Sequence, residues 1–227
     1  APYHIVTPAM HKSKKDIAEL FHEKLKIPLT DDAKELTLTA RNLLREKYLQ
    51  ADLGITGANF ILPDIGGIAI TENEGNARMS TAFPKIHIAI VGIEKVIPSY
   101  KDLNLFWPML AQSGTGQQIT VYSNIFTGPK QSKEEDGPEQ MYVILLDNGR
   151  TDLLQKPEKI EALKCIRCGA CLNTCPVYKT IGGHTYGATY SGPIGSVITP
   201  HFKGMEEFVH LSQASSLCGS CTSVCPV

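Results

Sequence analysis

Cys165-Ile-Arg-Cys168-Gly-Ala-Cys171-Leu-Asn-Thr-Cys175-Pro176 is the stretch that decides the fold expected for the last third of this sequence. Its spacing, Cys-x2-Cys-x2-Cys-x3-Cys-Pro, is typical of bacterial iron-sulfur ligation, where three thiolates hold one cluster and the fourth holds another. A second run, Cys218-Gly-Ser-Cys221-Thr-Ser-Val-Cys225-Pro226, repeats the same ending. The two runs together predict a mainly helical two-cluster module of the ferredoxin type.

The last cysteine of each run is expected to cross to the other cluster, which assigns all seven cysteines. The predicted ligands of the first cluster are Cys165, Cys168, Cys171 and Cys225. Those of the second cluster are Cys175, Cys218 and Cys221.

The second cluster lacks a fourth cysteine, because Ser215 stands where the motif would place it. Three outcomes stay open: Ser215 or a water binds the last iron, a cysteine beyond Val227 or on a partner binds it, or the cluster is [3Fe-4S] instead of [4Fe-4S].

The alternative to iron is a pair of zinc sites, since Cys-x2-Cys pairs also bind zinc. Zinc sites need four ligands each and give no reason for two Cys-Pro endings. An odd number of cysteines is also a poor disulfide framework, so a reducing compartment, the cytoplasm, fits better.

Composition excludes several classes of protein. The chain has 227 residues with 22 Lys plus Arg against 23 Asp plus Glu, so it offers no basic surface for nucleic acid. The apolar runs at 86–93 and 142–146 fall short of the roughly 20 residues that cross a bilayer, so no membrane-spanning segment is expected. The start at Ala1 and the end at Val227 suggest a fragment.

The first two thirds of the chain are expected to form an α/β domain. Helices are predicted at 13–26, where Ser13 and Asp16 form a capping box, from Thr30 onward, and at 101–112. Mostly buried strands are predicted at 53–56, 68–71, 86–92, 119–123 and 142–146. The alternation of strand and helix favours a partly parallel sheet, with a domain boundary near residue 155.

Several motifs resemble the lactate utilization protein B family. They are Gly-Ala-Asn-Phe (57–60), Asn-Glu-Gly-Asn-Ala-Arg (73–78), Leu-Asp-Asn-Gly-Arg (146–150), Cys-Ile-Arg-Cys-Gly-Ala-Cys-Leu-Asn (165–173), Ile-Gly-Gly-His (181–184) and Gly-Pro-Ile-Gly (192–195). The resemblance implies that 1–155 is the C-terminal portion of a LUD domain, similar to ribose-5-phosphate isomerase and CoA-transferase folds. It implies that 156–227 is a truncated iron-sulfur module with the same seven cysteine ligands.

The resemblance also implies a function. In that family three proteins together oxidise L-lactate to pyruvate, so this chain would be the electron-transfer subunit rather than a complete enzyme, with the other lactate-utilization subunits as partners. Two alternatives stay open: an iron-sulfur subunit for another 2-hydroxy acid or a disulfide reductase, and an isomerase-like or transferase-like enzyme with redox-sensing clusters.

Glu74, Asn76 and Arg78 are the candidate catalytic residues, because they follow the strand at 68–71, at an edge where open α/β sheets bind ligands. Arg78 could bind a carboxylate and Glu74 could act as a base. A plain turn explains the same residues, since Asn, Gly and Glu are common in turns.

His184, Tyr186 and Tyr190 lie between the two cysteine runs and could contact a cluster, although a packed loop is the simpler interpretation. Gly114-Thr-Gly116 follows a predicted helix instead of a strand, so it predicts no nucleotide site, and no flavin fingerprint is present.

Overall fold

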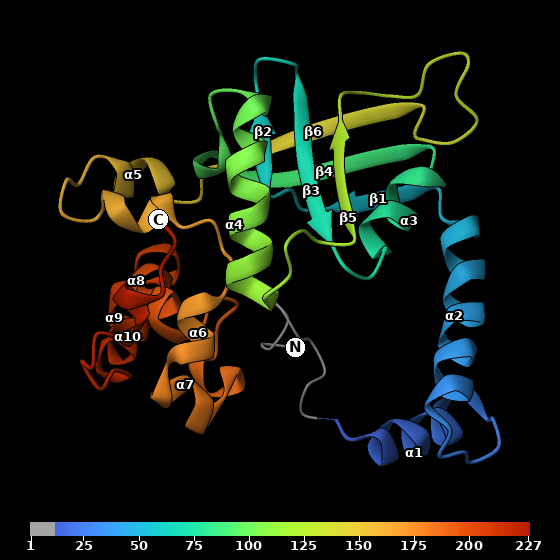
Figure 1. Ribbon diagram of the computed structural model, residues 1–227, viewed down its shortest axis with the longest axis horizontal. Helices are drawn as coiled ribbons and strands as arrows, with labels where there is room; N and C mark the ends of the chain where they lie inside the picture. Colours follow the sequence, from blue (N-terminus) through green and yellow to red (C-terminus); the bar gives the residue numbers. More distant parts are fainter. Residues whose placement is uncertain (1–11) are drawn as a thin grey trace.

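The computed structural model describes residues 12–227. Its α/β body contains two three-stranded sheets (Figure 1). The first is parallel, in the order β1 (Leu53–Thr56), β4 (Ile86–Gly92) and β6 (Gln140–Leu146). The second is antiparallel, in the order β2 (Phe60–Leu62), β3 (Gly67–Glu72) and β5 (Tyr122–Phe126). The predicted α/β class with a partly parallel sheet is confirmed, although the strands form two sheets and not one.

Strand β3 joins the layers because its side chains alternate between its two faces. Ile68 and Ile70 pack with Ala89 of β4 and fill the space between the sheets. Ala69 points the other way, into a core that helix α4 (Leu103–Thr115) shares with the antiparallel sheet. The members of this second core are Phe60, Leu62, Ala69, Ile97, Leu103, Leu110 and Ile166.

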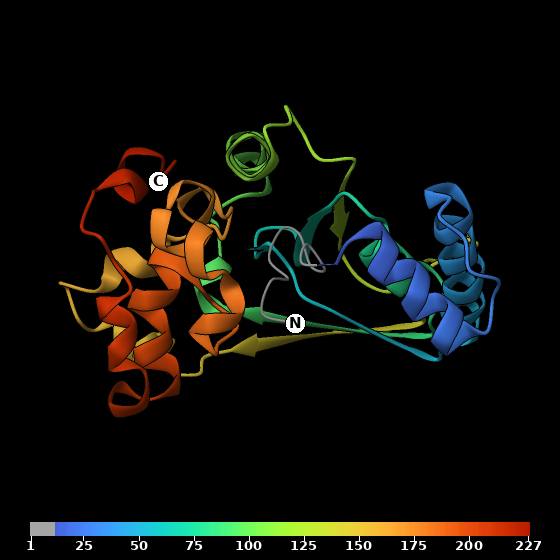
Figure 2. The ribbon, with the colours of Figure 1, turned by 90° about the horizontal axis from the view of Figure 1, so that it is seen from below.

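The outer face of the parallel sheet is open, so the prediction of mostly buried strands is wrong there. Ile55, Ile90 and Ile144 are 59%, 40% and 47% exposed, and Ile90 pairs directly with Ile144. No helix of the part that the structure describes covers this face (Figure 2). Parallel sheets are usually covered on both faces, so the strand sequences are apolar on a side that this chain leaves bare.

Helix starts follow their caps. The predicted capping box of α1 (Lys14–Leu25) is confirmed, because Asp16 accepts from the Ser13 backbone and Ser13 Oγ accepts from the Asp16 backbone. Helix α2 (Ala33–Gln50) begins later than predicted: Asp32 caps it by accepting from Lys34 N at 2.8 Å, whereas Thr30 lies outside the helix. An ionised cap at the helix N-terminus explains the choice.

Other boundaries also moved. Strand β5 begins at Tyr122, three residues later than predicted, and the short strand β2 was missed. Helix α5 (Arg150–Leu154), ahead of the predicted boundary near residue 155, was also missed. Near the C-terminus the chain forms α9 (Met205–Phe208) and a 3-10 turn at Val209–Gln213.

The C-terminal module is mainly helical and lies beside the end of α4 (Figure 1). Its remaining helices are α6 (Ala170–Thr174), α7 (Pro176–Ile181), α8 (Gly192–Lys203) and α10 (Ser220–Ser223). It has a small core of its own, formed by Tyr186, Ala188, Phe208 and Leu211. Among residues 12–227 no helix has the length and apolar character needed to cross a membrane.

Candidate iron-sulfur site

Five of the seven cysteines line one cavity of about 600 Å³ in the C-terminal module. They come from both runs, because α10 lies against α6. The five are Cys165, Cys168, Cys171, Cys221 and Cys225. The cavity therefore brings together the four cysteines predicted for the first cluster, together with one predicted for the second.

The two residues between Cys165 and Cys168 fix the first loop to the α/β body. Ile166 is 6% exposed and belongs to the core beneath α4. Arg167 has a φ of 64°, a left-handed conformation that non-glycine residues adopt rarely. Its side chain turns toward the carboxylate of Glu94. The neighbouring side chain of Ile166 instead enters the apolar core.

The end of α4 packs tightly on the same loop. A Cβ placed on Gly114 would lie 2.9 Å from the Cys168 carbonyl oxygen. The Gly114 carbonyl oxygen accepts a hydrogen bond of 3.3 Å from Asn173 Nδ2. Gly114 therefore allows the close approach of α4 to the loop.

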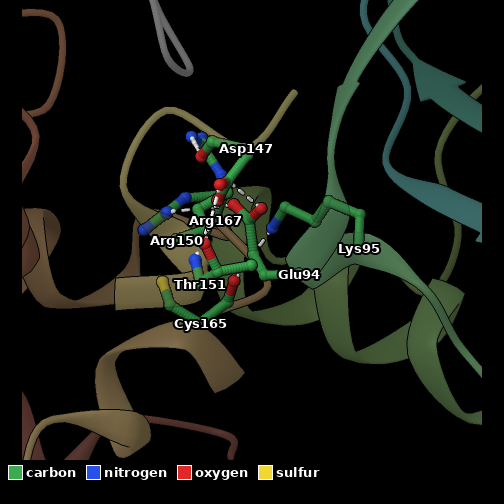
Figure 3. Close-up of polar contacts among 7 residues, drawn as sticks. All are labelled: Glu94, Lys95, Asp147, Arg150, Thr151, Cys165 and Arg167. Carbon is green, nitrogen blue, oxygen red and sulfur yellow. Dashed lines mark hydrogen bonds and ion pairs between the residues drawn. The ribbon is translucent and has the colours of Figure 1, made fainter. Parts of the chain in front are cut away.

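A buried group of charges links the α/β body, α5 and the first loop (Figure 3). Glu94 Oε2 lies 2.5 Å from Arg150 Nε, and Glu94 Oε1 lies 3.4 Å from Arg167 Nη2. Lys95 Nζ donates to the Cys165 carbonyl oxygen at 2.9 Å. One carboxylate thus faces three cations. The sequence analysis assigned no role to these residues, although Arg150 ends the Leu-Asp-Asn-Gly-Arg motif.

Aromatic rings cover the two guanidinium groups. Arg150 Cζ lies 4.7 Å from the Phe202 ring centroid, and Arg167 Cζ lies 4.6 Å from that of Tyr190. Burial and the nearby Arg167 charge together lower the pKa of Lys95 to about 8. Lys95 therefore remains largely protonated at pH 7, which adds to the positive charge beside the cavity.

The thiols of the metal-free chain differ in acidity. Burial raises the pKa of Cys171 to about 11, and burial also raises the pKa of Cys168. Hydrogen bonds with Ser216 and Ser220 lower the pKa of Cys218 to about 7. A metal must displace the protons of the buried thiols, so loading of this cavity releases protons.

The predicted second set of ligands is not assembled in the same way. Cys175 is buried, where its sulfur accepts from Tyr178 N at 3.4 Å, whereas Cys218 is exposed, and neither lines the cavity. Ser215 does line it, but its hydroxyl accepts from Leu217 N at 3.1 Å. The ligands of the second cluster stay a prediction.

Polar groups at the wall of the cavity suit an iron-sulfur cluster. Arg167 Nε and Nη1 are buried and have no hydrogen-bond partner in the described chain. Unsatisfied buried donors cost about 1–3 kcal/mol, so an acceptor is expected nearby. Sulfur atoms of a cluster are such acceptors. Within residues 12–227 no three Cys, His, Asp or Glu side chains are grouped closely enough to hold a metal ion as they stand. The spacing of the cysteines is that of iron-sulfur ligands.

A second cavity, of about 550 Å³, lies between the α/β body and the module. Cys165 and Lys95 line it together with apolar side chains such as Phe60, Phe106 and Leu163. Cys165 therefore lies between two hollows, one lined by cysteines and one mainly apolar.

The segment with Glu74, Asn76 and Arg78 forms the start of helix α3 (Asn76–Ala82). The carboxylate of Glu72 accepts from the backbone N–H groups of Ala77 and Arg78, each at 2.7 Å. A carboxylate just ahead of a helix stabilises the N–H groups of its first turn, so Glu72 has a structural role here.

The three candidate catalytic side chains are exposed and have local partners. Asn76 Nδ2 donates to Glu74 at 3.2 Å, and Arg78 Nη1 donates to Asn124 at 3.1 Å. Arg78 lines a cavity of about 280 Å³ beside the loop at 127–138. These contacts agree with the turn interpretation, and a catalytic role stays a prediction.

Of the residues between the runs, Tyr190 lines the cysteine cavity. Tyr186 is 1% exposed in the module core, and burial raises its pKa to about 12. His184 is exposed.

A protein-family comparison matches residues 3–146 to the LUD domain. The chain belongs to the LUD domain family. Residues 161–227 match the 4Fe-4S dicluster domain, which supports iron-sulfur clusters in the module. The resemblance drawn from the motifs is therefore confirmed.

Relatives named "Lactate utilization protein B" align with the whole chain. Those of Bacillus velezensis, Shouchella clausii and Bacillus subtilis are 46%, 47% and 45% identical over 226 residues. The chain spans about half of their length, 47% in each case. A crystal structure of a DUF162 family protein from Deinococcus radiodurans matches 44% of this chain and 57% of its own, at 16% identity and a TM-score of 0.33.

Proposed function

We propose that this chain is an iron-sulfur electron-transfer subunit of a system that oxidises L-lactate to pyruvate. The observation that carries the proposal is the cavity lined by five cysteines. The names of the longer relatives support lactate as the substrate. Lactate oxidation itself is assigned to a partner subunit, because this sequence contains no nicotinamide or flavin fingerprint.

The cysteines would hold two clusters. We assign Cys165, Cys168, Cys171 and Cys225 to one, expected as [4Fe-4S]. We assign Cys175, Cys218 and Cys221 to the other, which is [4Fe-4S] with a fourth ligand of another kind or [3Fe-4S]. When bound, such clusters accept and release single electrons.

The chain's own residues prepare the first site. Ile166 anchors the loop in the apolar core, which excludes water from one side of the cavity. Backbone hydrogen bonds from Ala170 and Ile194 reach the sulfur atoms of Cys168 and Cys171. Such bonds stabilise thiolates and orient them before the metal binds.

The test uses the complex purified anaerobically from its source, with L-lactate added and no other reductant. Oxidation of L-lactate to pyruvate releases two protons and two electrons, so we expect one pyruvate for every two electrons that appear in the visible spectrum of the iron-sulfur centre. A complex carrying Cys171→Ser should lose this reduction. Ser196→Ala changes another cavity residue and should retain it.

Reduction by glycolate but not by L-lactate would replace the substrate with another 2-hydroxy acid. Pyruvate production at the normal rate by the Cys171→Ser complex would remove the electron-transfer role.

A further inference from the structure

Arg167 is held at the wall of the cysteine cavity by contacts on two sides. Its guanidinium stacks on Tyr190 and its Nη2 lies 3.4 Å from Glu94. Its side chain is 13% exposed. Because these contacts use one edge and one face of the group, the remaining nitrogens are fixed in place.

Those remaining nitrogens, Nε and Nη1, are buried without a partner. Arginine carries five N–H donors in a planar fork and keeps its charge in proteins. Leaving such donors buried and unsatisfied destabilises a fold. Arg167 lines the same cavity as Cys165, Cys168 and Cys171, and a cluster bound there would bring sulfur acceptors next to its guanidinium group.

The charge around Arg167 points to the same kind of acceptor. Lys95 and Arg150 are buried beside it, and Glu94 is the carboxylate that pairs with Arg150 and Arg167. This buried group contains three cations and one anion, which leaves a surplus of positive charge next to the cavity. Four thiolates around an iron-sulfur core give a net negative charge, which becomes more negative when the cluster takes up an electron.

We propose that Arg167 donates its Nε and Nη1 hydrogens to sulfur atoms of the first cluster and thereby raises the reduction potential of that cluster. The inference rests on the proposed cluster site at Cys165, Cys168, Cys171 and Cys225. Hydrogen bonds to sulfur and nearby positive charge both favour the reduced, more negative state. Arg167 acts as a tuning and positioning residue, with Lys95 holding the Cys165 backbone in place at 2.9 Å.

The first test is a redox titration of the full chain, reconstituted anaerobically and followed by electron paramagnetic resonance. Dithionite supplies one electron to the cluster through mediators. We expect Arg167→Gln to keep its iron. At the wild-type midpoint potential its ratio of reduced to oxidised cluster should be about tenfold lower, which is a downward shift of the midpoint potential by about 59 mV. Arg167→Lys keeps the charge without the fork and should lie between the two.

Lys164→Gln is the matched control. Lys164 precedes Cys165 directly, but its side chain is 60% exposed and pairs with Glu161. Loss of an exposed charge is screened by water, so the midpoint should stay at the wild-type value. An unchanged midpoint in iron-loaded Arg167→Gln, or an equal shift in Lys164→Gln, would overturn the inference.

The second test uses the wild-type chain and does not depend on how a variant folds. The chain is labelled with 15N-arginine, and pulsed electron paramagnetic resonance of the reduced cluster is recorded. We expect a 15N coupling that disappears in Arg167→Lys, and its absence in the wild type overturns the inference. Absence of iron in the wild-type chain would instead refute the proposed cluster site, so the two failures are distinguishable.

Discussion

Replacing Glu94 by Gln tests the ion pairs that join the α/β body to the cluster loop. The side chains of Glu94 and Arg150 are 3% and 5% exposed. Breaking a buried pair by removing one partner costs about 3–5 kcal/mol, because the other charge stays buried. Gln keeps an oxygen that can accept from Arg150, so we expect a loss of about 3 kcal/mol in the free energy of unfolding. At about 2–4 °C for each kcal/mol, Tm falls by roughly 6–12 °C.

The assay is thermal unfolding of the full chain followed by circular dichroism, with calorimetry to check whether one transition is present. Glu161→Gln is the control, because it removes an exposed carboxylate. The Glu161 side chain is 73% exposed and lies 2.7 Å from Lys164 Nζ. Exposed pairs contribute only about 0–1 kcal/mol. If Glu94→Gln lowers Tm no more than Glu161→Gln does, the buried network does not stabilise this chain.

Three further predictions follow from particular contacts. Gly114→Ala places a Cβ 2.9 Å from the Cys168 carbonyl oxygen, which costs about 1–3 kcal/mol of stability and should speed the loss of iron to a chelator. Gly57→Ala is the control, because its Cβ would lie 3.9 Å from the nearest atom and should leave the rate unchanged. Equal rates of iron loss in the two variants would contradict the role of Gly114. In the metal-free chain at pH 7, iodoacetamide should label Cys218, with its pKa lowered to about 7, well before Cys171, with its pKa raised to about 11, as read by peptide mass spectrometry; labelling at equal rates counts against it. Burial lowers the pKa of His87 below 6.5, so on acidification the unfolded chain takes up the His87 proton first and the free energy of unfolding should fall as pH drops below about 6.5. In urea titrations at several pH values, His87→Gln should reduce this dependence of stability on pH. A pH dependence identical to that of the wild type would exclude His87 as its source.

Local patterns in the sequence predicted the features that depend on neighbouring residues. The capping box at Ser13 and Asp16 is confirmed because both partners lie within one helical turn. The spacing of the first cysteine run likewise placed Cys165, Cys168 and Cys171 in one loop, and the structure brings Cys225 to the same cavity.

Features that depend on distant residues were missed. The pairs of Glu94 with Arg150 and Arg167 join residues 56 and 73 positions apart, and no periodicity marks them. Strand β6 has the apolar sequence of a buried strand, but its exposure depends on which elements cover the sheet. At α2 the prediction started the helix at Thr30, whereas Asp32 is the cap, because Thr and Asp are both common at this position and stand only two residues apart.

The cysteine cavity makes one measurement the most direct test of the central claim. It is the iron, acid-labile sulfide and zinc content of the anaerobically reconstituted full chain, with electron paramagnetic resonance spectra before and after dithionite. The account predicts about eight irons with a signal in the reduced state, or about seven with an additional signal in the oxidised state if the second cluster is [3Fe-4S]. Zinc in place of iron, or fewer than about four irons, would contradict it.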